Sequence, residues 1–172
     1  DIMKVPLFLS LLINIKKKFE LITGYKDLSF EKLWLVSSLS DNTNKITLPY
    51  IPHIDKRRYL KAMVYLHDVN LEHGPIHLGR VKNTINIEKR RIKLPQNYQE
   101  RRLNTIDDED LKGSLTPMTG KAGDVIFFDT NTPHKAGIIK GSYYRKVLRF
   151  DFERPCFNPK ASMLNRIMKK II

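Results

Sequence analysis

Hydrophobic positions at the start of the chain predict a helix. Apolar residues recur at helical spacing over about residues 3–22, with Pro6 in the first turn and Gly24 placed to end the helix. The apolar run at 5–15 is too short to span a bilayer, and the lysines at 16–18 follow it, whereas a signal peptide carries its positive charge in front. We therefore expect a helix that covers the core, with docking on a membrane surface as the alternative.

Strand patterns dominate the rest of the chain. Residues 58–69 form a long apolar-rich run, which is the strongest strand prediction. In residues 143–153 apolar and polar side chains alternate, so one face is expected to pack against helices and the other to face a polar interior. Further strands or extended segments are predicted at 32–40, 46–55, 75–81 and 125–129, between clusters of turn-forming residues.

Two segments do not follow the strand pattern. Residues 82–112 are polar and highly charged, and we interpret them as a long insertion, which in a compact domain is often a functional lid. Residues 160–172 have the pattern of a basic amphipathic helix. We predict a single domain over 1–172, mainly β with flanking helices, whose core spans 30–153. The chain begins at Asp1 rather than at a methionine, which would also suit an N-terminally truncated fragment.

Composition narrows the expected partners and compartment. The chain has 31 Lys and Arg residues against 18 Asp and Glu residues, a formal charge of +13, which favours anionic partners. A solvated basic surface is the alternative interpretation. The single cysteine, Cys156, excludes an internal disulfide and a cysteine-based zinc site, and it fits a reducing compartment, so we predict a cytoplasmic protein. The sequence does not indicate an oligomeric state.

Candidate metal ligands occur in two short motifs that lie far apart in the chain. His53 and Asp55 are two residues apart in an extended segment, so their side chains point to the same side. Alone, this spacing is a weak signal, because it arises readily by chance. A further histidine such as His134, brought alongside, would complete a set of two imidazoles and one carboxylate. Such a set leaves half of an octahedral metal open and is typical of non-haem Fe(II) oxygenases.

Arg145 is a candidate anion-binding residue. It follows His134 by eleven residues, which is enough for a tight turn and a return along a neighbouring strand. Its guanidinium could bind a carboxylate through two parallel hydrogen bonds, a geometry for which arginine is better suited than lysine. The alternative is a structural ion pair with Asp151 or Asp124.

Four pieces of sequence occur together in one order, and no single one is decisive. They are His53-x-Asp55, the segment 65–76 (YLHDVNLEHGPI), the segment 123–129 (GDVIFFD) with Pro133-His134, and Arg145. In these pieces the chain resembles the phytanoyl-CoA dioxygenase-like branch of the Fe(II)/2-oxoglutarate-dependent oxygenases. The resemblance implies a cupin-like double-stranded β-helix, or jelly roll, with Fe(II) held by His53, Asp55 and His134. It also implies that Arg145 binds the distal carboxylate of 2-oxoglutarate.

The resemblance implies an activity as well. With O2 as the other co-substrate, the protein would hydroxylate an unactivated C–H bond and release succinate and CO2. Related halogenases lack the carboxylate ligand to make room for chloride, so the presence of Asp55 favours hydroxylation. We expect a small, or lipid-, CoA- or glycan-linked, anionic substrate, with the basic cluster at 56–58 at the rim of its site.

Other interpretations remain open at this point. One is a catalytically inactive jelly roll that binds an anionic polymer or a membrane surface through its positive charge. An enzyme acting on nucleic acid or protein ranks last, because no motif combines aromatic and basic residues for base stacking. The remaining histidines are interpreted as structural: His67 as a core or supporting residue, and His73 and His77 as turn or surface residues.

Overall fold

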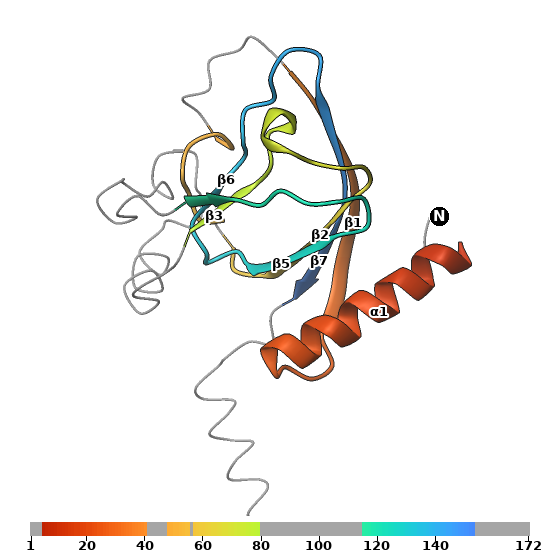
Figure 1. Ribbon diagram of the computed structural model, residues 1–172. Helices are drawn as coiled ribbons and strands as arrows, with labels where there is room; N and C mark the ends of the chain where they lie inside the picture. The colour runs from red at the N-terminus through yellow and green to blue at the C-terminus, as the bar shows by residue number, and fades with distance from the viewer. Residues whose placement is uncertain (1–4, 41–47, 56, 80–114, 154–172) are drawn as a thin grey trace, which may run out of the picture.

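The computed structural model describes residues 5–40, 48–55, 57–79 and 115–153. The predicted insertion at 82–112 and the predicted helix at 160–172 lie outside these described residues. Within them the chain forms one long helix and two antiparallel sheets (Figure 1). The elements are α1 (Pro6–Thr23), β1 (Ser29–Leu39), β2 (Leu60–Tyr65), a 3₁₀ helix (Leu71–His73), β3 (His77–Gly79), β4 (Leu115–Pro117), β5 (Val125–Asp129), β6 (His134–Lys135) and β7 (Tyr144–Glu153).

The two sheets have different sizes. The larger has the strand order β1-β7-β2-β5, and the smaller has the order β4-β3-β6. Figure 1 shows α1 on the outside of the larger sheet, while β3 and β6 lie on the opposite side of the molecule. The predicted mainly β class is therefore confirmed, with one helix flanking the sheets in the described part of the chain.

Helix α1 covers the outer face of the larger sheet. It starts with Pro6 in its first turn and stops at Gly24, which adopts a left-handed conformation (φ 71°) and donates its N–H to Glu20 O at 2.9 Å. In the helix, Leu12, Ile15 and Phe19 are buried against the strands. The outward-facing side chains of β2 and β7 complete this cluster: Leu60, Ala62, Val64, Leu148, Phe150 and Phe152.

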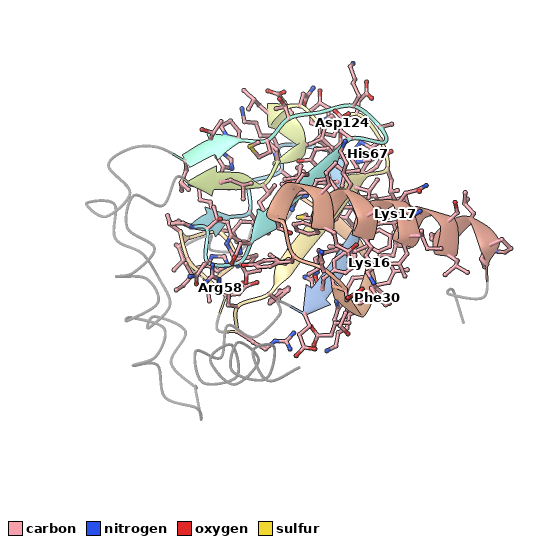
Figure 2. All side chains as sticks on the ribbon, turned by 90° about the horizontal axis from the view of Figure 1, so that it is seen from below. Lys16, Lys17, Phe30, Arg58, His67 and Asp124 are labelled. Atoms are coloured by element: carbon pink, nitrogen blue, oxygen red, sulfur yellow. The ribbon has the colours of Figure 1, made fainter. Side chains whose placement is uncertain are left out.

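The helix is exposed on its other side, where Lys16 and Lys17 project from it (Figure 2). No helix in the described ranges is long and apolar enough to cross a membrane.

The inner faces of β2 and β7 are mixed in character. In the antiparallel register, Lys61 lies opposite Asp151, and Met63 lies opposite Arg149. Arg145 extends from the same side of β7 and is buried. The predicted alternation in 143–153 is therefore observed, with the apolar positions towards α1 and a polar set inside.

Some strand boundaries differ from the prediction. Strand β2 is shorter than the predicted 58–69, because Asp68 turns aside to accept hydrogen bonds from the Ala122 backbone N–H at 3.0 Å and from Lys121 Nζ at 2.8 Å. The described part of the extended segment 46–55 contains only a single bridge, between His53 and His134. The three-residue strand β4 and the 3₁₀ helix were not predicted.

Two glycines allow a close contact between backbones next to β6. Gly137 donates its N–H to Pro75 O at 2.9 Å, and a Cβ placed on Gly137 would lie 2.4 Å from that oxygen. Gly74 has a positive φ of 62°, and a Cβ there would lie 2.6 Å from Gly137 O. Neither position tolerates a side chain without movement of the backbone, and the contact ties the chain after His134 to the loop before β3.

Candidate metal centre

A backbone bridge brings the two predicted ligand motifs together. His53 N donates to His134 O at 3.0 Å, and His134 N donates to His53 O at 2.8 Å. Asp55 N donates to Thr130 O at 3.2 Å, which continues the pairing along the same two segments. Ile54, between His53 and Asp55, is fully buried, as expected for an extended segment with alternating side chains.

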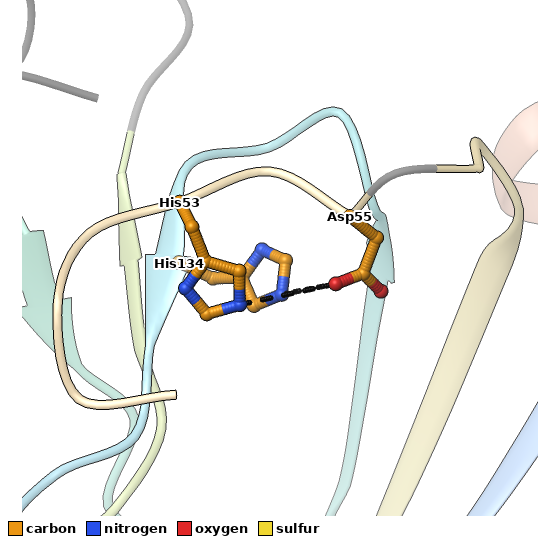
Figure 3. A group of neighbouring side chains, drawn as sticks. All are labelled: His53, Asp55 and His134. Carbon is orange, nitrogen blue, oxygen red and sulfur yellow. Dashed lines mark ion pairs between the residues drawn. The ribbon is translucent and has the colours of Figure 1, made fainter. Parts of the chain in front are cut away.

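The three side chains converge on one point (Figure 3). Asp55 Oδ1 lies 3.3 Å from His134 Nε2 and 3.8 Å from His53 Nε2. One potential ligand atom from each residue lies within 4.8 Å of the others. The structure thus brings together the three residues that the sequence analysis named, and their role as metal ligands remains a prediction.

Each imidazole is oriented by the backbone carbonyl two residues before it in the chain. His53 Nδ1 is 2.8 Å from Ile51 O, and His134 Nδ1 is 2.8 Å from Thr132 O. A carbonyl oxygen only accepts, so Nδ1 donates in both rings, and Nε2 of each ring faces the cluster. The hydrogen bond at Nδ1 orients each ring, and Nε2 is the ring atom available to a metal.

Electrostatics favour a neutral His53 and an anionic Asp55. Burial, with a contribution from His134, lowers the pKa of His53 from 6.5 to about 4, so this ring is neutral at pH 7. Burial alone would raise the pKa of Asp55, but the hydrogen bond with His134 and the charge of Lys61 outweigh it and hold that pKa well below its ordinary value. Two imidazoles and an anionic carboxylate fit a divalent transition metal.

Lys61 is a site residue that the sequence analysis did not single out. Its Nζ lies 3.0 Å from Asp55 Oδ2, and the side chain is 8% exposed on the inner face of β2. The signal in the sequence was a single cation within the otherwise uncharged strand LKAMVY. The hydroxyl of Tyr59 also hydrogen-bonds Asp55 and contributes to lowering the pKa of that carboxyl.

A cavity of about 500 Å³ opens beside the cluster, and Arg145 lines it together with His53, Asp55 and His134. Arg145 is 8% exposed, and its Nε and Nη1 atoms have no hydrogen-bond partner in the described part of the chain. Burial lowers the pKa of Arg145, although a guanidinium stays charged at neutral pH. The cavity is also lined by Val36, Met63, Ile76, Ala136 and Arg149.

The structural alternative for Arg145 is not observed. Asp151 accepts instead from Arg149 Nη2 at 2.8 Å and from Trp34 Nε1 at 3.1 Å. Asp124 accepts from the backbone N–H of Lys121 at 2.7 Å. Arg145 is thus a buried cation with free donors in the same cavity as the His-Asp-His cluster, which fits a carboxylate ligand.

The other histidines lie away from the cavity. His67 and Asp124 lie at the opposite end of the β2-β5 pair from Arg58 (Figure 2). The interpretation of His67 as a core residue in a strand is wrong, because β2 ends at Tyr65 and His67 is half-buried, with its ring 5.2 Å from that of His73. His77 is half-buried on β3, with Nδ1 3.1 Å from Pro75 O.

Two antiparallel sheets lie around two histidines, one aspartate and a buried arginine, which is the arrangement of cupin-like non-haem metal proteins. Residues 44–147, more than half of the chain, match the Phytanoyl-CoA dioxygenase (PhyH) family. The chain therefore belongs to this family, as its sequence motifs indicated. A comparison with curated proteins finds no significant match.

Two solved structures are similar to this chain at low sequence identity. The epimerase SnoN, crystallised with Fe3+, alpha-ketoglutarate and nogalamycin RO, is 20% identical with a TM-score of 0.51, and the match covers 73% of this chain and 50% of SnoN. EvdMO1 is 17% identical with a TM-score of 0.49, over 80% of this chain and 30% of EvdMO1. The chain thus spans half or less of the length of these two structures. The predicted double-stranded β-helix is confirmed.

Proposed function

We propose that this protein is an Fe(II)- and 2-oxoglutarate-dependent dioxygenase that hydroxylates a C–H bond. The observation that carries the proposal is one cavity lined by two imidazoles, a carboxylate and a buried guanidinium whose Nε and Nη1 have no partner in the described part of the chain. Membership of the PhyH family supports the same chemistry. SnoN, whose fold this chain shares, was crystallised with an iron ion and alpha-ketoglutarate.

One set of residues would bind the metal, and Arg145 would bind the co-substrate. His53, Asp55 and His134 would hold Fe(II) on one face, leaving the remaining positions for 2-oxoglutarate and O2. Arg145 would bind the distal carboxylate of 2-oxoglutarate through Nε and Nη1, which have no partner within the described ranges. When bound, the iron and 2-oxoglutarate supply the oxidising chemistry, in which one atom of O2 enters succinate, CO2 is released and the other atom enters the substrate C–H bond as a hydroxyl.

The proposal includes the type of reaction and the class of substrate. The presence of Asp55 as a third ligand leaves no ligand position for chloride, which favours hydroxylation over halogenation. Lys135 lines the same cavity and adds positive charge to it, and Arg57 lines it as well, paired with Glu31. We therefore propose an anionic substrate that is small, or linked to a lipid, CoA or glycan.

Spectroscopy without substrate tests the centre directly. Anaerobic addition of Fe(II) and 2-oxoglutarate to the full chain should give the weak visible charge-transfer band of the chelate. His134→Ala should abolish the band, while Lys121→Ala, at the far end of β2, should leave it unchanged. Absence of the band in the unmodified protein would contradict the proposal. The inactive jelly roll would instead be favoured if the protein bound an anionic polymer, with an affinity that falls as salt is added and does not change with iron.

The reaction itself is tested by the release of succinate. Candidate anionic substrates should raise the rate of succinate release above the rate without substrate, and His134→Ala should release none. If Arg57→Ala and Lys135→Ala leave the rate of succinate release unchanged for every anionic substrate, the proposed substrate class is contradicted.

A further inference from the structure

Lys61 is a buried cation whose position is fixed on several sides. It extends from the inner face of β2, where its Nζ lies 5.1 Å from the ring centre of Tyr59 and 5.3 Å from that of Phe128. A buried ammonium is costly unless a carboxylate accepts from it. Asp55 Oδ2 does so at 3.0 Å, whereas Asp151, which lies opposite Lys61 in the strand register, accepts from Arg149 and Trp34.

This contact gives the two oxygens of Asp55 different surroundings. Oδ1 faces the Nε2 atoms of His134 and His53, at 3.3 Å and 3.8 Å. Oδ2 faces away from the imidazoles and is bound to Lys61. A carboxylate held in this way offers a cation a single oxygen, because the other is already engaged with an ammonium group.

We propose that Lys61 is a positioning residue and a resident counter-ion for Asp55. It holds the carboxylate so that Oδ1 alone is presented with the two imidazoles, and it neutralises the buried carboxylate while the metal is absent. The pairing stands on geometry alone, and its effect on a metal rests on the proposed function. Tyr59 also hydrogen-bonds Asp55 but is neutral, so Lys61 is the partner that supplies charge.

The counter-ion has a consequence for metal binding. A divalent cation entering next to Asp55 meets a carboxylate whose charge Lys61 already offsets, so the gain in stability on binding is smaller than for an unpaired carboxylate. Lys61→Met keeps the length and apolar volume of the side chain but removes its charge. In that variant the metal is the main positive charge that offsets the negative charge of Asp55. Metal binding should therefore stabilise Lys61→Met more than it stabilises the unmodified protein.

Thermal unfolding with and without Mn(II) measures this effect in the full chain. We expect the Mn(II)-induced rise in Tm to be at least twice as large in Lys61→Met as in the unmodified protein. Lys135→Met is the matched control, because Lys135 lines the same cavity and no ion pair joins it to Asp55 in the described residues. An equal rise in Lys61→Met and the unmodified protein, or an enlarged rise in Lys135→Met, would overturn the proposal.

Co(II) absorption tests the positioning role separately. In Lys61→Met the carboxylate is free to bind through both oxygens, which raises the coordination number and should weaken the visible d–d bands per bound ion. The Lys135→Met spectrum should match that of the unmodified protein. Identical Co(II) spectra for Lys61→Met and the unmodified protein would overturn the assignment of Lys61 as a positioning residue.

A double-mutant cycle in metal-free protein tests the pair without reference to iron. Lys61→Met and Asp55→Asn should each lower the urea midpoint, and the double variant should lose clearly less than the sum of the two. Additive losses would overturn the pairing. If Lys61→Met alone does not fold, recovery of folding in the double variant supports the pair, and lack of recovery contradicts it. If Mn(II) raises the Tm of neither the unmodified protein nor the variants, both the effect of Lys61 on a metal and the proposed function are contradicted. The double-mutant cycle still tests whether Lys61 and Asp55 form an ion pair.

Discussion

The two faces of β2 and β7 differ although they belong to the same strands. Towards α1, Leu148, Phe150 and Phe152 on β7 pack with the apolar residues of β2 and the helix. Towards the cavity, the same strands present the buried side chains of Lys61, Arg145 and Asp151. The outer face gains stability from burial, whereas the inner face carries desolvated charges and donors that have no partner among the residues the structure describes. The comparison indicates that packing on the outer face stabilises the sheet, while the inner face of the same sheet is arranged for binding.

The largest expected effect is on the outer face. Phe150→Ala should lower the free energy of unfolding by about 3–5 kcal/mol, because it removes a fully buried ring from the cluster beneath α1. Urea unfolding measures the loss. Leu35→Ala on β1 is the control, since Leu35 is 65% exposed and its truncation should have little effect. A loss as small as that of Leu35→Ala would contradict the assignment of this face as the stabilising one.

The inner face should show the reverse pattern. Arg145→Met should weaken 2-oxoglutarate binding roughly hundredfold, about 2–3 kcal/mol, because charge-assisted hydrogen bonds to the distal carboxylate are lost. The stability of the ligand-free protein should be unchanged or increased, because a buried cation with unpaired donors is removed. Titration of the Fe(II) protein with 2-oxoglutarate gives the affinity, with Arg57→Met at the cavity as control. Equal affinity in Arg145→Met and the unmodified protein would rule out this role.

A smaller effect is expected from pH on metal-free protein. Because burial lowers the pKa of His53 from 6.5 to about 4, the unfolded chain binds a proton between these values that the folded protein does not. Stability from this group therefore falls as the pH drops, by about 2 kcal/mol at pH 5. Urea unfolding at pH 7 and pH 5 measures it, and His53→Gln should lose correspondingly less. Equal losses in the two proteins would contradict a buried neutral His53.

The sequence predicted the long strands well and the short ones poorly. The alternation at 143–153 and the apolar run at 125–129 correspond to β7 (Tyr144–Glu153) and β5 (Val125–Asp129). Strand β4 has only three residues, too few for a period of two to be recognised. The end of β2 is set by the contacts of Asp68 with Lys121 and Ala122, more than fifty residues away, which no local pattern contains.

The site could be predicted where residue type alone carries the chemistry. Histidine, aspartate and arginine are recognisable as ligands and anion binders, and the family motifs gave their order in the chain. Lys61 was missed because a lone lysine in a strand more often lies with its charge at the surface. Its role depends on the distance to Asp55, and that distance is set by the bridge between His53 and His134.

The contact between Gly74 and Gly137 sets limits on how this cavity can be redesigned. Ala136 lines the cavity and is open to variation in a mutant library that seeks new substrates. Its neighbour Gly137 is not, because a methyl group there would meet the Pro75 carbonyl at 2.4 Å and displace the segment that carries His134. Substrate range can thus evolve at one residue while the very next one must stay fixed.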